Sequence, residues 1–215
     1  MNKTIYFLSG LGADERMFQF LKLPNYTLKH IRWVEPINFD EKIESYAKRL
    51  LEQIEDEKPV IIGLSFGGMV AMEIAKQILV KKIILLASAQ TYHQIPFYYK
   101  ILGKLYINKI LPIHLLKKVN VFTYWFFGVK KEQDKKLLKS VIENTSSNFL
   151  KWAIDTILHW KNTTIHPNLK HIHGSSDRIL PLKFIKTDKT IRNGGHLMTL
   201  DKYEEISKEI LDFLQ

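Results

Sequence analysis

The sequence predicts an α/β fold in which helices cover both faces of a mostly parallel sheet. Three observations lead to this prediction. Short apolar runs alternate with amphipathic segments over residues 1–88, the alternation returns over residues 165–215, and some runs, such as residues 83–86, are wholly apolar. Alternating strands and helices are typical of parallel sheets, and unbroken apolar runs are typical of strands buried on both faces.

Six strands and four helices of this core can be assigned from local patterns. The apolar runs predict strands at residues 4–9, 27–33, 59–63, 82–88, 169–173 and 189–192. Asp14 can cap a helix that runs to Phe20, and Asp40 can cap an amphipathic helix whose apolar side chains recur at helical spacing up to Ile54. Two more helices are expected over residues 66–79 and 202–214.

The character of the sequence changes between about residues 89 and 164. Strand patterns fade there, while aromatic residues and lysines become frequent. Apolar residues at helical spacing predict helices near residues 137–142 and 149–158, and Ser146 or Ser147 can cap the second of them. We interpret residues 89–164 as a helical insertion into a core formed by residues 1–88 and 165–215.

Composition narrows the classes of protein to consider. The formal net charge is +10, but only five of the 32 basic residues are arginine, the side chain best suited to recognising phosphates and bases. Without a nucleic-acid-binding motif, no nucleic-acid partner is expected. The absence of cysteine excludes disulfides and thiolate chemistry. With no secretory signal and no apolar run of membrane-spanning length, we expect a cytoplasmic protein without a membrane anchor.

A candidate nucleophile lies in residues 63–67, Gly-Leu-Ser-Phe-Gly, which match the pattern G-x-S-x-G. The pattern joins a predicted strand to a predicted helix, and that is the context in which a nucleophilic serine is presented to solvent. Glycines on both sides leave room for a turn in which Ser65 adopts a strained backbone conformation. We therefore expect Ser65 to act as a nucleophile, and the alternative is an ordinary glycine-rich turn.

A serine hydroxyl needs a base, and His196 is the best candidate. It follows Gly194 and Gly195 in a loop before the last predicted helix, whereas the other seven histidines lie in predicted strands, in the insertion or ahead of the candidate acid. Asp177, just after the strand predicted at residues 169–173, is expected to orient this base. A turn or cap role for Asp177 is the alternative, and Asp188 and Asp201 are weaker candidates for the acid.

No metal or cofactor site is expected. His171 and His173 are two possible ligands, but no third ligand follows at a spacing typical of a metal site. Residues 10–12, Gly-Leu-Gly, lack the third glycine and the later acidic residue of a dinucleotide-binding loop, and no Walker-type phosphate loop is present. The expected reaction therefore proceeds without a cofactor.

The chain order serine, aspartate, histidine is the order found in α/β-hydrolases. The sequence resembles that superfamily over nearly its full length, and the matching pieces are residues 9–12, 63–67, 173–177 and 195–196. The resemblance implies the α/β-hydrolase fold, with Ser65, Asp177 and His196 as catalytic residues.

The resemblance also implies an oxyanion hole and a lid. The two oxyanion donors would be the backbone amides of Phe66 and of Leu11, in the loop after the first strand. Many members carry His-Gly in that loop, where this sequence has Ser9 and Gly10, and this difference bears on the subfamily more than on a backbone donor. The lid would be residues 89–164. We expect its Trp125 and Phe126 to bind substrate, and the alternative is that its aromatics only pack the lid on the core.

These features together predict a hydrolase that cleaves a small or medium apolar carboxylic ester through an acyl-enzyme intermediate. Its partner would be the small-molecule ester itself. A thioesterase or an acyltransferase using the same triad is an alternative, and so is a slow-turnover ligand-binding protein that keeps the fold.

One further hypothesis concerns the surface of the insertion. An aromatic run at residues 121–129 is preceded by Lys117 and Lys118 and followed by Lys130 and Lys131. Apolar side chains flanked by cations can make transient contact with an anionic interface. The alternative is that the aromatics face inward and the lysines are merely solvated.

Overall fold

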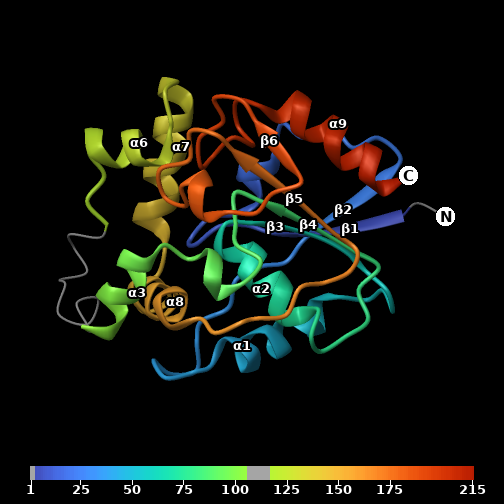
Figure 1. Cartoon of the computed structure of the whole chain (residues 1–215), viewed down its shortest axis with the longest axis horizontal. Helices are drawn as coiled ribbons and strands as arrows, with labels where there is room; N and C mark the ends of the chain where they lie inside the picture. The colour runs from blue at the N-terminus through green and yellow to red at the C-terminus, as the bar shows by residue number, and fades with distance from the viewer. Residues whose placement is uncertain (1–2, 106–116) are drawn as a thin grey trace.

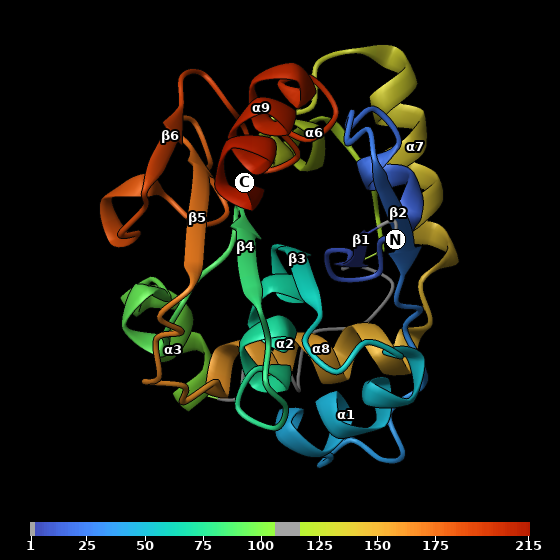
Figure 2. The ribbon, with the colours of Figure 1, turned by 90° about the vertical axis from the view of Figure 1, so that its right-hand side faces the viewer.

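The structure is a computed structural model that describes residues 3–105 and 117–215. In these residues six strands form one sheet with the order β2-β1-β3-β4-β5-β6, and every neighbouring pair is parallel. Figure 2 shows the strands in this order across the sheet. Their bounds are β1 (Lys3–Leu8), β2 (Tyr26–His30), β3 (Val60–Leu64), β4 (Lys82–Leu86), β5 (Leu169–Gly174) and β6 (Lys189–Ile191).

Each face of the sheet carries its own apolar layer, because successive strand residues point to opposite faces. Tyr6 and Leu8 belong to a layer with α1 (Ile43–Leu50) and α2 (Phe66–Ile74), whereas Ile5 and Phe7 belong to a layer with α9 (Tyr203–Leu214). Figure 1 shows α1 and α2 on one side of the strands and α9 on the other. The prediction of a parallel sheet covered on both faces is confirmed.

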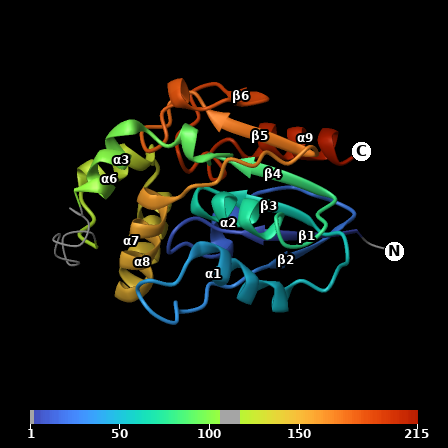
Figure 3. The ribbon, with the colours of Figure 1, turned by 60° about the horizontal axis from the view of Figure 1, so that its bottom comes forward.

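The helices between β4 and β5 lie at the carboxyl ends of the strands. They are α3 (Phe97–Lys104), α6 (Val121–Phe127), α7 (Glu132–Asn144) and α8 (Ser147–His159). In Figure 3 the arrowheads of β4 and β5 point toward this group. The helices predicted near residues 137–142 and 149–158 are confirmed by α7 and α8, and Ser146 caps α8 by accepting the N–H of Phe149. Residues 106–116 of the predicted insertion lie outside the described residues.

Two predicted helix starts turn out differently. Asp14 does cap a helix, through a bond from the N–H of Arg16, but that helix is the short 3-10 segment η1 (Glu15–Phe18). The prediction that Asp40 caps α1 is wrong, because Lys42 precedes the first turn and makes no side-chain cap. A turn closed by the Asn38 side chain, which accepts the Asp40 N–H, occupies the residues just before the helix.

The remaining short 3-10 segments join these elements. They are η2 (Leu51–Gln53), η3 (Tyr92–Gln94) and η4 (Leu182–Phe184). No helix in residues 3–105 or 117–215 has both the length and the apolar character needed to cross a bilayer.

Strand order determines where a site can form. The chain places β2 on one side of β1 and β3 on the other, so the connections after β1 and β3 diverge at the carboxyl edge of the sheet. In open α/β sheets this divergence leaves the crevice in which ligands bind. Residues 9–13 follow β1 and Ser65 follows β3, so the topology brings these two segments to the same crevice.

Helix α2 begins one residue after β3, and the close crossing leaves no space for side chains at two glycines. A Cβ on Gly63 would lie 2.4 Å from the Cα of Gly68, and a Cβ on Gly67 would lie 2.2 Å from the carbonyl oxygen of Ser9. Both clashes are with backbone atoms, which cannot swing aside. The glycines on either side of Ser65 therefore permit the approach of α2 to β1 and β3.

We expect Gly63→Ala to lower the free energy of unfolding by about 3 kcal/mol, because the new methyl group overpacks a backbone crossing. Urea denaturation of the purified variant measures the loss. Gly10→Ala is the matched control, since its nearest neighbour, the Cβ of Ser65, would be 3.6 Å away. Equal losses in the two variants would contradict the explanation by close backbone contact.

Candidate active site

Ser65 occupies the turn between β3 and α2 in a conformation that side-chain-bearing residues rarely adopt, with φ 52° and ψ −121°. Such a conformation costs about 1–3 kcal/mol and persists where the surroundings enforce it. Three hydrogen bonds do so here. The Ser65 N–H donates to the carbonyl of Leu86 at 2.9 Å, and the Ser65 carbonyl accepts from the Gly68 N–H at 2.9 Å and from the Ser88 hydroxyl at 2.6 Å.

The structure brings the three predicted catalytic residues together. His196 Nε2 lies 2.8 Å from the Oγ of Ser65, and His196 Nδ1 lies 2.8 Å from Oδ2 of Asp177. Asp177 comes from the loop after β5 and His196 from the loop after β6, and both side chains are buried. A carboxylate on one ring nitrogen and a hydroxyl on the other fix the neutral tautomer that carries its proton on Nδ1.

The buried carboxylate of Asp177 is surrounded by donors. Its Oδ1 accepts the N–H groups of Ile179 and Leu180, each at 2.9 Å, and its Oδ2 faces His196 and lies 3.4 Å from Nε2 of His173. Burial by itself raises the pKa of Asp177, but the charge and hydrogen bond of His196, together with His173 and Leu180, hold that pKa below its usual value. The carboxylate is therefore ionised at neutral pH.

The rival candidates for the acid have other roles or positions. Asp188 accepts the backbone N–H of His171 at 2.8 Å, and neither Asp188 nor Asp201 is hydrogen-bonded to His196 in the described part of the chain. Burial, with a smaller contribution from the neighbouring His173, lowers the pKa of His171 to about 3. The two rings lie side by side, with His173 Nδ1 3.4 Å from His171 Nε2.

His173 supports the loop that carries Asp177. Its Nε2 donates to the carbonyl of Leu180 at 2.8 Å, so both the N–H and the C=O of Leu180 are engaged beside the carboxylate. In residues 3–105 and 117–215, no three His, Asp or Glu side chains gather in a way that could hold a metal ion. The histidine pair instead belongs to the hydrogen-bonded support of Asp177.

Two backbone amides remain available beside Ser65. Within the described residues, neither the N–H of Leu11 nor that of Phe66 donates a hydrogen bond to the protein. The N–H of Phe66 belongs to the first turn of α2, where amides have no partner inside the helix. These two amides are the donors expected of an oxyanion hole.

The loop that carries Leu11 is fixed by three side chains, and sequence analysis predicted this role for none of them. The Ser9 hydroxyl donates to the Ala13 carbonyl at 2.5 Å, and the indole of Trp33 donates to the Gly10 carbonyl at 3.2 Å. Thr145, at the end of α7, donates to the Gly12 carbonyl at 2.9 Å. Residue Gly12 has φ 67°, and a Cβ there would lie 2.1 Å from the Thr145 hydroxyl. Only tertiary contacts, absent from any local pattern, identify these supports.

A cavity of about 260 Å³ opens onto Ser65 and His196. Among the described residues, its wall is almost wholly apolar and includes no side chain of lysine, arginine, aspartate or glutamate. The rest of the wall comes from the segment after β1, from helices α6, α7 and α8, and from the loops that carry Asp177 and His196. Its residues are Gly10, Leu11, Ala13, Met17, Thr123, Phe127, Leu138, Val141, Ile142, Thr145, Leu150, Ile154, Ile157, Ile179 and Leu197.

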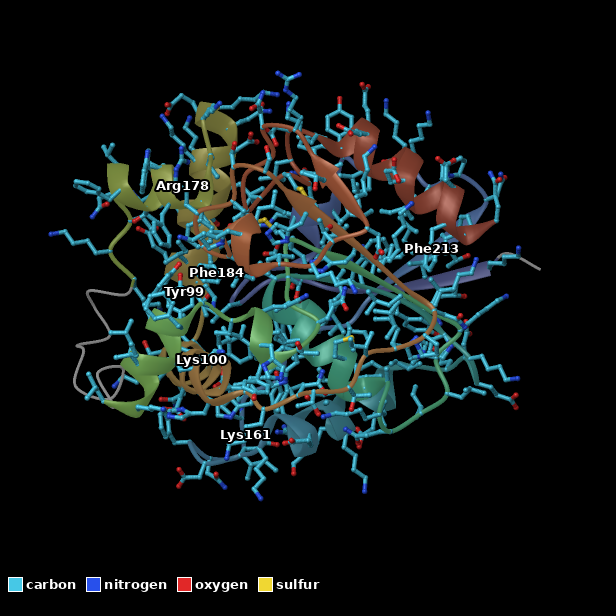
Figure 4. The ribbon with its side chains drawn as sticks, in the orientation of Figure 1. Tyr99, Lys100, Lys161, Arg178, Phe184 and Phe213 are labelled. Carbon is cyan, nitrogen blue, oxygen red and sulfur yellow. The ribbon has the colours of Figure 1, made fainter. Side chains whose placement is uncertain are left out.

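Trp125 and Phe126, which the sequence predicts to bind substrate, are not among the described residues that line this cavity, and α6 presents Thr123 and Phe127 to it. These two residues are four apart and share one helix face, whereas the intervening side chains point elsewhere. The guanidinium carbon of Arg178 lies 4.3 Å from the centre of the Trp125 ring. The backbone carbonyl of Trp125 accepts a hydrogen bond from Arg178 Nη1 at 2.8 Å. Figure 4 labels Arg178 beside α6. A run of consecutive aromatics did not reveal which of them would face inward.

A second contact joins helix α3 to the loop that carries Asp177. Tyr99, on α3, donates its hydroxyl to the carbonyl of Ile179 at 3.0 Å, and the neighbouring Tyr98 lies edge-on to Phe184, with ring centres 6.0 Å apart. Tyr99 and Phe184 are labelled close together in Figure 4. The helices after β4 are thus attached to the loop that positions the acid.

Comparison with known proteins identifies the fold. No protein-family model and no curated protein sequence matches the chain. Among solved structures, it is similar to a bromoperoxidase from Bacillus anthracis (18% identity, 100% of this chain and 92% of the other, TM-score 0.72). It is also similar to an esterase from Exiguobacterium antarcticum (17% identity, 98% of this chain and 91% of the other, TM-score 0.71). A third similar structure is an enol-lactonase from Burkholderia xenovorans LB400 (12% identity, 100% of this chain and 92% of the other, TM-score 0.67). Identities this low establish the fold alone, and the chain has the fold of the α/β-hydrolase superfamily.

Proposed function

We propose that the protein is a serine hydrolase that cleaves a small or medium apolar carboxylic ester through an acyl-enzyme intermediate. The observation that carries the proposal is the continuous chain of contacts from Ser65 Oγ through His196 to Asp177 at the end of an apolar cavity. A nucleophile within hydrogen-bond reach of a base, and a base oriented by a third group, are the elements of covalent acyl transfer.

The reaction would begin when Ser65 Oγ attacks the ester carbonyl while His196 Nε2 takes the hydroxyl proton. The imidazolium, stabilised by ionised Asp177, then gives that proton to the departing alcohol, which leaves an ester between Ser65 and the acyl group. A water molecule, deprotonated by His196, then attacks the carbonyl of this acyl-enzyme. The ester bond to Ser65 Oγ breaks, the acid is released, and His196 returns the proton to Ser65 Oγ. No cofactor takes part in either half of the cycle.

The negative oxygen of each tetrahedral intermediate would lie between the amides of Leu11 and Phe66. An aimed donor of this kind contributes about 3–4 kcal/mol to the stability of a transition state. The fixed loop after β1 supports this role, because its carbonyls are held by Ser9, Trp33 and Thr145 while the N–H of Leu11 stays unengaged.

The cavity supports a neutral apolar acyl or alcohol group as the substrate portion bound beside Ser65. Its wall would desolvate a charged group without providing a counter-charge, which is unfavourable. Helices α6, α7 and α8 provide much of this wall, and we propose that residues 89–164 serve as the lid of the site. Esterase and lactonase are the names of two similar structures, which is consistent with ester chemistry on this fold.

We expect Ser65→Ala to lower ester hydrolysis by at least three orders of magnitude while the melting temperature stays within a few degrees. A fluorophosphonate probe should label the wild-type protein at Ser65 and leave the variant unlabelled. Turnover of nitrophenyl esters distinguishes an enzyme from a protein that only binds esters. Hydrolysis by purified Ser65→Ala within tenfold of the wild type would exclude Ser65 as the nucleophile.

Acidification should reduce kcat/KM through a single ionisation, because a protonated imidazole cannot take the proton of Ser65. Asp177 adds no second ionisation to this fall, since its pKa lies below the usual value. In His196→Ala the residual rate should lose this dependence, and Asp177→Asn should keep the fold but lower kcat by several orders of magnitude. A pH profile unchanged in His196→Ala would show that another group is the base.

Filling the cavity should shorten the preferred acyl chain. Ile154→Trp adds bulk to a lining position of α8, so the ratio of kcat/KM for hexanoate over acetate nitrophenyl esters should fall at least tenfold. Phe126→Ala is the matched control on α6, where the side chain does not line the cavity, and its ratio should equal that of the wild type. A ratio that changes in Phe126→Ala and not in Ile154→Trp would place the acyl group elsewhere.

A further inference from the structure

Exposed apolar side chains are concentrated on two short helices, α3 and α6, at the same end of the molecule (Figure 1). Thirteen large hydrophobic side chains are exposed in the described part of the chain, and eight of these belong to α3, its C-cap and α6. Val121 and Phe122 are the most exposed, at 79% and 80%. The full set is Phe97, Ile101, Leu102, Leu105, Val121, Phe122, Trp125 and Phe126. We call these eight residues the apolar end. Exposed apolar residues scattered singly need no explanation, whereas α3 with its C-cap and α6 each expose four, and this concentration favours an interaction site.

The apolar end lies on the side of the molecule that holds the site. Both α3 and α6 lie to the left in Figures 1 and 3, beyond the carboxyl ends of the strands and opposite the two termini. A partner seated there would therefore be close to the crevice of Ser65 and not behind the sheet.

The stretch of sequence that spans the apolar end carries charge of one sign. Residues 95–131 contain seven lysines and no aspartate or glutamate. The structure describes six of these lysines, and none of the six forms an ion pair with a described residue. Lys100 instead lies over the ring of Tyr92, 5.0 Å from the ring centre. The described lysines are Lys100, Lys104, Lys117, Lys118, Lys130 and Lys131. Lys130 and Lys131 act electrostatically on Asp201 and Asp134. The charge of the other four is available to a partner.

A groove between α6 and α7 extends this cationic surface. Trp125, Lys130, Lys136, Lys139 and Arg178 line it, together with Tyr124 and Lys135. The acidic residue on its wall, Glu132, is paired with Lys135 at 2.6 Å. The groove therefore presents a surplus of cations directly beside the exposed face of α6.

We propose that the apolar end docks on the surface of an anionic lipid bilayer. Exposed aliphatic and aromatic side chains enter the boundary between headgroups and acyl chains, while lysines around them meet anionic headgroups. A second copy of the chain fits this surface poorly, because it would bring two sets of unpaired lysines together. A nucleic acid offers no apolar counterpart to Ile101, Leu102 and Leu105. This proposal does not rest on the proposed function, because binding can be measured without turnover.

Co-sedimentation of the full chain with vesicles tests it at 0.15 M salt. Vesicles of phosphatidylcholine with 40% phosphatidylglycerol should bind at least tenfold more protein than phosphatidylcholine alone. Val121→Ser combined with Phe122→Ser should lower binding to the anionic vesicles at least tenfold, and so should Lys117→Glu combined with Lys118→Glu. Circular dichroism verifies that the variants fold.

Matched controls exist on other surfaces of the protein. Ile37 and Leu79 are 72% and 63% exposed, so Ile37→Ser with Leu79→Ser removes similar exposed apolar area elsewhere, and Lys58→Glu with Lys81→Glu makes the same change in charge. Both control pairs should bind vesicles as the wild type does. Ser65→Ala should also bind normally, which separates this proposal from the proposed function.

Three outcomes would overturn the proposal. The first is equal binding to neutral and anionic vesicles. The second is an equal loss in the apolar-end variants and their controls, which would indicate a general charge or hydrophobic effect. The third is absence of vesicle binding together with a dimer in sedimentation equilibrium that Val121→Ser with Phe122→Ser dissociates, which would assign the surface to a second copy.

Discussion

The backbone conformation of Ser65 is the constraint on which the site depends. A residue with positive φ immediately after β3 turns the chain sharply, so that the side chain of Ser65 leaves the sheet and the first amides of α2 point into the crevice. That turn brings α2 against the backbone of β1 and β3, and only glycines fit at the crossing. The bonds to Leu86 and from Ser88 come from β4 and the residues just after it. The neighbouring strand thus stabilises a conformation that the turn alone would not keep.

Electrostatics impose a second constraint, because Asp177 must keep its charge in a buried position. Burying a carboxylate without partners is costly enough that the group would take up a proton instead. Two backbone N–H groups on Oδ1 and the histidines near Oδ2 offset that cost and lower the pKa. His173 contributes through Leu180, whose carbonyl it holds. The support of the Asp177 carboxylate therefore extends beyond Ser65 and His196 to a second layer of residues.

Sequence patterns predicted the features that depend on local spacing. Runs such as residues 83–86 identified buried strands, and glycines around Ser65 identified the turn, since both signals are contained in a few neighbouring residues. Asp40 failed as a cap because the Asn38 turn competes for the same stretch of chain. Trp125 lies outside the lining of the cavity because facing a cavity depends on the phase of α6, and Arg178, 53 residues away, helps to fix that phase. Long-range partners of this kind leave no local pattern.

Helix α6 connects the two surfaces that the protein presents at this end. One face contributes Thr123 and Phe127 to the cavity, and the other exposes Val121 and Phe122. The C-terminal end of α6 contacts the loop that carries His196. The N–H of Leu197 donates to the carbonyl of Phe127 at 3.4 Å, and a Cβ on Gly128 would lie 2.9 Å from the Cα of Gly195. A helix is about 10 Å across, so whatever rests on its outer face lies within one helix diameter of the cavity wall. A displacement of α6 large enough to open the cavity would also disturb the loop that holds His196. The opening of the cavity and the position of His196 are therefore mechanically coupled through this helix.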